Sequence, residues 1–514
     1  MAENLKSNGP RVAIVGAGLA GISAVIALKK QLAYENFTIY ERASSVGGTW
    51  RDNTYPGCGV DVAAHWYSLS TELNPDWSAY YVTQPEIRAY WQRLFDKYTL
   101  QKKTIFNTSV NDAKWHSDTQ KYTLILHNEV TGEDQQVEVE VVIYAIGGFM
   151  SPMFPKDIPG TESFKGIAFH SARWRHDVDL RGKTVGVIGN GCSAAQFIPV
   201  ISSDPTVKVI NFCRTPQWFL YRGNYHYPSW IRWIFRCFPF IMRLYRNYLM
   251  AVAFTRYIQK MAPKDMAQEL IPKYSVGCKR IIIDPDYLKS LHRPNVEVTW
   301  SPIDCVAPDG LKLRSGEVVP LDVIIFGTGY SVESNLNIEG INGVTLRDYF
   351  VAKGGATAYL GSAIPGFPNM FILVGPNVAT GHASLVFSQE CQIQMALQAI
   401  KPIIDGKIRS VQVTHKATDD YNRQLQSKLG NSVWQDCHSY YHVAGTNQSK
   451  IIAVYPGSVT SFWWHTRRLR PSHWQVEGAT TENWTGHGNV TLSNAIFSLG
   501  VICIPALLCM YQYR

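Results

Sequence analysis

Two glycine-rich segments of the chain have the residue spacing of dinucleotide-binding turns. The first, VAIVGAGLAG, contains Gly16, Gly18 and Gly21, and the second, VGVIGNGCSA, contains Gly189, Gly191 and Ala194. In such a turn the first glycine allows a sharp bend from strand to helix, and the second lets a pyrophosphate approach the backbone. The helix that follows attracts the phosphate charge to its N-terminus. Two such turns predict that two dinucleotides meet in this protein, one passing a hydride to the other.

The residue that ends the next strand distinguishes the two dinucleotides. In the first unit the strand FTIYE ends in Glu41, twenty residues after Gly21. A carboxylate there can accept hydrogen bonds from ribose hydroxyls, so this unit is predicted to bind FAD, or NAD without a 2′-phosphate. In the second unit the strand VINFCRT ends in Arg214 and Thr215. A cation at this place suits a 2′-phosphate, so the second unit is predicted to prefer NADPH over NADH.

Each turn needs a buried parallel strand before it and a helix after it, which makes the fold class α/β. The 514 residues exceed what one hydrophobic core holds, so two or three domains are expected. We predict two Rossmann-like dinucleotide-binding domains, for FAD and for NADP, with the second inserted in the first. The predicted parts are the first part of the FAD-binding domain over 1–150, a linker over 151–182, the NADP-binding domain over 183–330, the second part of the FAD-binding domain with a substrate loop over 331–470, and a C-terminal tail over 471–514.

A helical insertion is expected at about 225–275 of the NADP-binding domain, where an aromatic and basic stretch runs from 230 to 254. Its arginines recur at helical spacing, at Arg232, Arg236, Arg243 and Arg246. This pattern favours a helix that covers the domain with a solvated basic stripe. The alternative is a patch that binds a membrane surface.

The composition excludes several classes of function. Hydrophobic residues make up 46% of the chain and charged residues 17%, which is typical of a folded protein with large cores. The net charge of +9 is spread along the chain, so a nucleic acid partner is not expected. The ten cysteines contain no CxxC pair and no metal-ligand spacing with histidine. They are predicted to be reduced, mostly buried thiols in a cytosolic protein that binds no metal.

An apolar segment at 490–511 lies near the C-terminus. It reaches about the 20 residues that a membrane-spanning helix requires. The polar N-terminus carries no secretory signal. We therefore expect a cytosol-facing protein that this tail anchors to a membrane, and the alternative is a soluble cytoplasmic protein whose tail docks on the core.

Two longer motifs carry a resemblance to a known family. FKGIAFHSARW contains Phe164, Gly166, His170 and Trp174, and GGTWRDNTYPGCGVD contains Gly47, Gly48, Trp50, Tyr55, Pro56, Gly57 and Asp61. With these motifs the chain resembles the class B flavoprotein monooxygenases and, among them, the type I Baeyer–Villiger monooxygenases. GCKR at 277–280 and FGTGY at 326–330 extend the likeness, which covers residues 11 to about 465. One departure is Arg175, because the family usually has Pro or Asp directly after the signature tryptophan.

The resemblance implies FAD and NADPH as cofactors, with O₂ and a small-molecule ketone as the other reactants. In the family NADPH reduces the flavin, the reduced flavin adds O₂ to give a C4a-peroxide, and the peroxide converts a ketone to an ester or lactone. By the same resemblance Arg280 and Asp61 are catalytic: Arg280 keeps the peroxide deprotonated, and Asp61 orients Arg280. Lys279 is expected to help Arg214 and Thr215 hold the 2′-phosphate. The further cofactor contacts are expected at Gly48, Thr49, Trp50, Asp61, Tyr67, Val110, Ser193 and Arg280.

Two other functions stay open at this point. One is a related flavin monooxygenase that performs N- or S-oxidation, hydroxylation or epoxidation, and the other is a non-enzymatic flavin-binding protein. The leading hypothesis is the Baeyer–Villiger reaction on a bulky, lipophilic ketone of secondary metabolism, with a pocket lined by the insertion and a loop at 434–447. The resemblance places His170 in the linker between the domains, not among the acid–base groups. Cys58 is expected to be a small filler, since no base is visible beside it.

Overall fold

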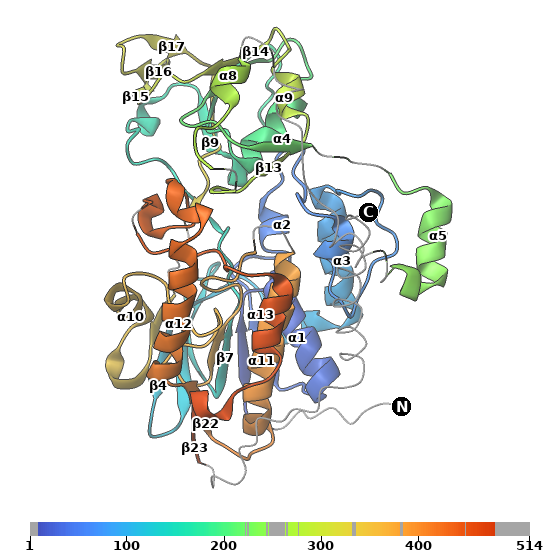
Figure 1. Ribbon diagram of the computed structural model, residues 1–514, viewed down its shortest axis with the longest axis vertical. Helices are drawn as coiled ribbons and strands as arrows, with labels where there is room; N and C mark the ends of the chain where they lie inside the picture. The colour runs from blue at the N-terminus through green and yellow to red at the C-terminus, as the bar shows by residue number, and fades with distance from the viewer. Residues whose placement is uncertain are drawn as a thin grey trace.

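The computed structural model describes residues 9–478 apart from 222, 224–225, 243–244, 246–262, 264–265, 276, 332–335, 381–383 and 448. Figure 1 shows two bodies, one above the other, with the helices α1, α11, α12 and α13 in the lower body and α4, α8 and α9 in the upper body. Each body is built on its own parallel sheet. The predicted α/β fold with two dinucleotide-binding domains is confirmed.

The lower body is centred on five parallel strands. Their order across the sheet is β21 (Met370–Ile372), β7 (Val141–Tyr144), β1 (Val12–Val15), β2 (Phe37–Tyr40) and β3 (Thr104–Ile105). The middle strand, β1, is buried along its whole length, as expected for a strand covered on both faces. Because side chains alternate along a strand, Val12 and Ile14 enter one core while Ala13 and Val15 enter another.

Helices cover one face of this sheet and a second sheet covers the other. The helices are α1 (Leu19–Leu32), α3 (Gln84–Lys97) and α11 (Leu385–Ile404), and α1 packs against α11. The second sheet has the order β20 (Asn337–Glu339), β4 (Thr108–His116), β5 (Lys121–Asn128) and β6 (Asp134–Val139). The remaining elements are α2 (Thr49–Asp52), α10 (Leu346–Ala352), α12 (His415–Gly430), α13 (Val459–Thr466) and the pair β22 (Ser410–Val413) and β23 (Trp474–Glu477).

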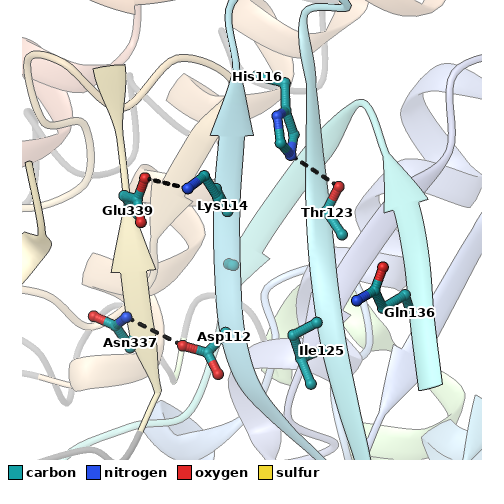
Figure 2. Close-up of a pocket in the computed structure, with 9 residues that line it drawn as sticks. Asp112, Lys114, His116, Thr123, Ile125, Gln136, Asn337 and Glu339 are labelled. Carbon is teal, nitrogen blue, oxygen red and sulfur yellow. Dashed lines mark hydrogen bonds and ion pairs between the residues drawn. The ribbon is translucent and has the colours of Figure 1, made fainter. Parts of the chain in front are cut away.

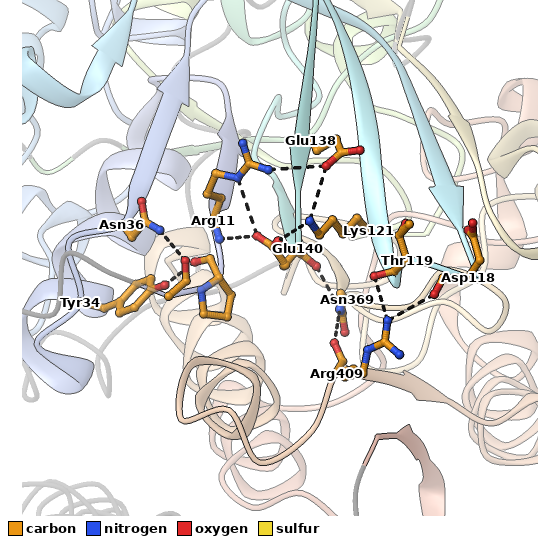
Figure 3. A network of polar contacts seen from close by, with 12 residues as sticks. Arg11, Tyr34, Asn36, Asp118, Thr119, Lys121, Glu138, Glu140, Asn369 and Arg409 are labelled. Atoms are coloured by element: carbon orange, nitrogen blue, oxygen red, sulfur yellow. Dashed lines mark hydrogen bonds and ion pairs between the residues drawn. The ribbon is translucent and has the colours of Figure 1, made fainter.

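A polar network closes the far end of this body (Figure 3). The backbone N–H of Arg11, just before β1, donates to the Glu140 carboxylate at 2.5 Å, and Lys121 lies 3.5 Å from the same carboxylate. The Asn369 side chain donates to the carbonyl oxygens of Glu140 and Arg409, at 2.9 and 3.2 Å. These bonds join β7 to the late strand β21, so residues from both ends of the chain complete one sheet.

The upper body has a second five-stranded parallel sheet. Its order is β14 (Val296–Thr299), β11 (Lys208–Phe212), β10 (Thr184–Ile188), β18 (Val323–Phe326) and β9 (Ile167–His170). The helices of this body include α4 (Cys192–Ile201) and α9 (Tyr287–Ser290), and a small antiparallel sheet joins β15 (Ile303–Ala307), β16 (Gly310–Leu313) and β17 (Val318–Pro320). The motif FKGIAFHSARW thus supplies the edge strand β9, with His170 opposite Phe326.

Two chain segments connect the bodies. The first contains β8 (Ser151–Pro152) and the second β19 (Tyr330–Ser331), and these strands pair antiparallel. The Thr328 hydroxyl donates to the Met153 carbonyl at 2.5 Å. The outward and return segments therefore run side by side and restrict how the two bodies move.

The predicted helical insertion at about 225–275 contains α5 (Ser229–Cys237) and α8 (Ala267–Leu270) in its described part, and it lies between the paired strands β12 (Phe219–Tyr221) and β13 (Ile282–Asp284). Helix α5 projects from the side of the molecule (Figure 1). Arg236 forms an ion pair with Asp76, and Trp230 and Trp233 are exposed. Arg243 and Arg246 lie outside the described residues, so the predicted basic stripe is traced only over α5.

No helix within the described part of the chain is long and apolar enough to cross a membrane. The predicted anchor at 490–511 lies outside the described residues.

Candidate active site

The first glycine turn presents bare backbone at the start of α1. A Cβ atom on Gly21 would lie 2.0 Å from the Gly16 carbonyl oxygen, so only glycine allows α1 to pack this closely on the turn. Gly18 caps α1 without a side-chain hydrogen bond, and its face lies against the backbone of Gly48. The N–H groups of the first turn are thus left to an outside acceptor, which suits a pyrophosphate.

Glu41 lies at the edge of this turn. Its carboxylate accepts a hydrogen bond from the Ala17 N–H at 2.7 Å and forms an ion pair with Arg51 at 3.0 Å. The carboxylate is only 8% exposed. These contacts fix its position, while a carboxylate has further lone pairs that can accept from ribose hydroxyls.

The other expected flavin contacts come from α2, from the short helical turn that ends at Tyr67 and from β4. Thr49 and Trp50 begin α2, and the Trp50 indole donates to the Tyr67 hydroxyl at 3.1 Å. Burial raises the pKa of Tyr67, so its hydroxyl stays protonated. Val110 lies buried on β4, in the core beneath the parallel sheet.

The second glycine turn resembles the first, except that no other described residue lies beside its middle glycine, Gly191. A Cβ atom on Gly189 would lie 2.6 Å from the Gly327 carbonyl oxygen, and Ala194 is fully buried where α4 packs on the sheet. Gly191 caps α4 without a side-chain bond and has nothing within 4 Å of the place where a Cβ would stand. Ser193 follows in the first turn of α4. The turn is therefore open where a phosphate would approach.

Cations gather beside this second turn. The Lys279 ammonium donates to the Thr215 hydroxyl at 3.2 Å and lies 4.8 Å from the centre of the Tyr274 ring. Burial lowers the pKa of Lys279, and the nearby charge of Arg214 lowers it further. In the described part of the chain neither Lys279 nor Arg214 forms an ion pair with a carboxylate. Two like charges held together in this way suit an anionic group such as a 2′-phosphate.

Arg280 and Asp61 meet across the two bodies. The Arg280 Nη2 and Nε atoms donate to the same oxygen of Asp61, at 2.7 and 3.1 Å, and the side chains are 26% and 29% exposed. The Asp61 charge raises the pKa of Arg280, so the guanidinium carries its charge at any useful pH. The charges of Asp61 and Arg280 both act on the pKa of Cys192, at the start of α4. Burial raises its pKa to about 11, so it remains a neutral thiol.

The loop that carries Asp61 docks on α4 through Gln196. The Tyr55 hydroxyl donates to the Gln196 side-chain oxygen at 3.0 Å, and the Gln196 amide donates to the Gly59 carbonyl at 3.0 Å. A Cβ atom on Gly57 would lie 2.4 Å from the Gln196 carbonyl oxygen, so this residue must be glycine for the loop to approach α4. The sequence gives no signal for Gln196 beyond its place one turn after Cys192.

Two tyrosines of the late loop lie close enough to Arg280 for its charge to affect their pKa. Burial raises the pKa of Tyr441, and the positive charge of Arg280 acts to lower the pKa of both tyrosines. Their rings lie 4.6 Å apart, and Tyr440 is 60% exposed. Both lie in the loop at 434–447 that the sequence places at the pocket, although the residues themselves are not foreseen.

One expectation about the cysteines is wrong. Cys278 and Cys437 form a disulfide, whereas all ten cysteines are expected to be reduced. The two are 159 residues apart in the chain, so no local spacing such as CxxC reveals the pair. Cys58 behaves as expected, because burial raises the pKa of its thiol to about 12 and keeps it protonated.

The signature residues His170 and Trp174 lie on and directly after β9, the edge strand of the upper sheet. Trp174 packs its ring against Phe169 and Phe197, with ring centres 5.3 Å apart in each case. The His170 Nδ1 atom accepts a hydrogen bond from the Ala172 N–H at 3.1 Å. Burial lowers the pKa of His170 to about 4, so the ring is neutral near pH 7. Arg175 pairs with Asp177 at the surface.

A hollow on the outer face of the four-stranded sheet is a different feature (Figure 2). Its charged and polar side chains pair with one another, Lys114 with Glu339 at 2.9 Å and Asn337 with Asp112 at 3.1 Å. None of the expected site residues lines it. In the part of the chain that the structure describes, no group of three or more His, Cys, Asp or Glu residues could hold a metal ion.

Known proteins resemble this chain both in sequence and in fold. The flavin-binding monooxygenase-like family matches residues 9–354. A Baeyer–Villiger monooxygenase of Pseudomonas aeruginosa is 35% identical over 89% of each chain. One of Streptomyces coelicolor is 33% identical over 93% of this chain and 96% of its own. An FAD-binding monooxygenase of Aspergillus terreus is 30% identical over 94% of this chain and 92% of its own.

The structural comparison agrees with the sequence comparison. An oxidized steroid monooxygenase bound to NADP superposes with a TM-score of 0.79, at 25% identity, over 91% of this chain and all of its own. A closed cyclohexanone monooxygenase superposes with a TM-score of 0.78, at 24% identity, over 92% of this chain and all of its own. The resemblance predicted from the motifs is confirmed, and the chain belongs to the flavin-binding monooxygenase-like family, among relatives that are Baeyer–Villiger monooxygenases.

Proposed function

We propose that this protein is an FAD- and NADPH-dependent Baeyer–Villiger monooxygenase, which uses O₂ to convert a ketone to an ester or lactone. Its relatives over most of the chain are enzymes of that name, and solved structures of the same fold bind FAD and NADP. The observation that carries the proposal is the Arg280–Asp61 pair, which joins the two dinucleotide-binding bodies.

The residues of the two turns fit the two cofactors. Gly16, Gly18, Gly21 and Glu41 would hold FAD, because the turn offers free N–H groups and a fixed carboxylate. Arg214, Thr215 and Lys279 would hold the 2′-phosphate of NADPH, because they place two cations and a hydroxyl together. Bound there, FAD supplies the oxygenating chemistry with electrons from NADPH.

Arg280 acts in this proposal as a fixed positive charge. Because Asp61 raises the pKa of Arg280, the guanidinium keeps its protons and does not serve as an acid. A ketone bound beside Arg280 would develop negative charge on its oxygen atom as it reacts, and a fixed positive charge there would stabilise the transition state. Asp61 orients the fork by accepting from two of its nitrogens.

Replacing Arg280 tests the proposal. We expect Arg280→Ala to lower the rate of ester or lactone formation by roughly 100- to 1,000-fold, as removal of a stabilising donor does elsewhere. Arg280→Lys should recover only part of the rate, since it restores the charge without the fork. Asp61→Ala should resemble Arg280→Ala, and Arg314→Ala, on an exposed turn of the upper body, is the matched control.

When the unaltered protein converts a ketone under ¹⁸O₂, one ¹⁸O atom must appear in the ester or lactone. An Arg280→Ala variant with an undiminished rate would contradict the proposed role. An amine or sulfide oxidised faster than every ketone offered would assign the protein to the neighbouring N- and S-oxidising enzymes instead.

The proposed substrate is a bulky, lipophilic ketone, of the kind found in secondary metabolism. The aromatic pair Tyr440 and Tyr441 beside Arg280 supports this class, because aromatic side chains suit apolar ligands. A series of ketones of increasing size, compared by kcat/KM, tests it. Faster turnover of small cyclic ketones than of multi-ring ketones would contradict it.

We also propose that residues 490–511 attach the protein to a membrane. This proposal rests on the sequence of that segment alone.

A further inference from the structure

The disulfide between Cys278 and Cys437 joins the segment that carries Arg280 to the late loop that carries Tyr440 and Tyr441. Cys278 lies two residues before Arg280, and Cys437 lies three residues before Tyr440. Their Cα atoms are 6.1 Å apart. A hydrogen bond of 2.7 Å from the Ser275 hydroxyl to the Asp436 carboxylate supports the same junction.

The two segments come from different bodies of the molecule. The segment around Cys278 and Arg280 belongs to the upper body, and the segment at 433–441, which begins with η6 (Val433–Asp436), follows α12 in the lower body. In Figure 1 the chain beyond α12 lies on the side of the lower body that faces the upper body. The disulfide is thus a covalent link between the bodies, beside the Arg280–Asp61 ion pair.

The ion pair cannot hold this arrangement by itself. Both side chains are more than a quarter exposed, and ion pairs of that kind contribute at most about 1 kcal/mol. A disulfide that closes a loop of more than a hundred residues restricts the chain far more strongly. The covalent link is therefore the stronger of the two constraints that hold the two bodies together beside Arg280.

We propose that the Cys278–Cys437 disulfide positions the late loop against Arg280, and that its reduction by an external dithiol releases the loop and uncouples NADPH use from ketone oxygenation. The inference rests on the proposed function and names two positioning residues for it. Loss of the link moves Tyr440 and Tyr441 away from the guanidinium. The site then loses the geometry that selects the ketone over side reactions.

The redox step is an ordinary thiol–disulfide exchange. A thiolate of the dithiol attacks the sulfur of Cys437, a residue that is 6% exposed while Cys278 is fully buried. The Cys278 sulfur leaves as a thiolate and takes up a proton. The second thiol of the reductant then displaces Cys437, so the reductant becomes a cyclic disulfide and passes two electrons and two protons to the protein. Cys192 is not expected to compete, because its thiol stays protonated.

The first measurement requires no ketone. The full chain, loaded with FAD, is digested without reductant, and we expect one linked peptide pair that contains Cys278 and Cys437. Hydrogen exchange of residues 433–441 is then compared before and after treatment with dithiothreitol. We expect faster exchange after reduction, and equally fast exchange in the Cys278→Ser/Cys437→Ser variant with or without reductant.

The second measurement compares ketone product with hydrogen peroxide at a fixed consumption of NADPH. We expect reduction to lower the ratio of product to hydrogen peroxide roughly tenfold, with FAD content and the Kd for NADP⁺ little changed. The double variant should show the lower ratio under both conditions. Cys305→Ser, which alters a half-buried cysteine of β15, is the control and should respond to reductant as the unaltered protein does.

Unlinked peptides in the oxidised protein would overturn the proposal. So would a ratio of ketone product to hydrogen peroxide that changes neither with reductant nor in the double variant. Absence of any ester or lactone from the fully oxidised protein is a separate result, and it would count against the proposed function. The linked peptides and the exchange rates distinguish the two failures, because both are measured without a ketone.

Discussion

At the scale of single residues, the notable feature is that the proposed catalytic pair adds little stability. Arg280 and Asp61 are 26% and 29% exposed, and an ion pair of that kind is worth about 0–1 kcal/mol. Its importance lies instead in position, since each residue comes from a different body. Loss of either residue should therefore reduce activity much more than it reduces the free energy of unfolding.

The cations beside the second turn lead to a prediction about cofactor preference. Lys279→Ala and Arg214→Ala should each lower the preference for NADPH over NADH by about 10- to 100-fold, because each removes a charge-assisted contact with the 2′-phosphate. Initial rates with the two cofactors give the preference. Lys312→Ala, on the exposed part of β16, should leave it unchanged. A variant that weakens NADPH and NADH equally would contradict the assignment.

His170 leads to a prediction about pH and stability. Its pKa in the folded protein is about 4, lowered by burial from 6.5, so between these values the unfolded chain binds the proton and the folded chain does not. The contribution of His170 to the free energy of unfolding is therefore complete above pH 6.5 and is lost as the pH falls towards 4. The loss amounts to about 3 kcal/mol.

Denaturant unfolding at several pH values between 4 and 7 measures this effect. The free energy of unfolding should fall less steeply with acidification in His170→Gln than in the unaltered protein. His415→Gln, which replaces an exposed histidine at the start of α12, should keep the original slope. Equal slopes in all three proteins would show that His170 titrates normally.

At the scale of the elements, replacing a glycine by alanine should have different effects in the two glycine turns. Gly21→Ala places a Cβ 2.0 Å from the Gly16 carbonyl, so we expect loss of FAD and of stability although alanine favours helices by about 1 kcal/mol. Gly191→Ala meets nothing within 4 Å, so the fold should survive while the Kd for NADP⁺ rises about tenfold or more. Gly430→Ala, also in open space, is the control. Thermal unfolding and cofactor titration separate the outcomes.

The sequence predicts these elements unevenly, for physical reasons. The strands and helices around the two turns are local patterns, and the turns, Glu41 and Arg214 follow from them, whereas Lys279 follows only from the family resemblance. Gln196, Tyr440 and the Cys278–Cys437 disulfide depend on contacts between distant segments, which no local spacing encodes. The pairing of Arg280 with Asp61 was available only through the family resemblance, since nothing in the spacing of 219 residues indicates it.

At the scale of the whole molecule, the C-terminal segment gives a further prediction. Full-length protein should sediment with membranes after cell breakage, whereas a chain that ends at Gly478 should stay in the supernatant, because about 20 apolar residues suffice to span a bilayer. Immunoblots of the two fractions measure this. Both proteins in the supernatant would contradict the proposed attachment, and the unchanged NADPH oxidation of the shorter chain would serve as a control for folding.

The position of β21 next to β7 has a consequence for biosynthesis. On the ribosome, residues 12–144 emerge first, yet their sheet lacks its edge strand until residues 370–372 have been made. The upper sheet needs only residues 167–326, so the half that starts second can finish first. Because domains fold as units during synthesis, the flavin-binding domain remains incomplete, with β7 as an edge strand unpaired on one side, until β21 has been made. We expect chaperones to bind the nascent chain at this exposed edge.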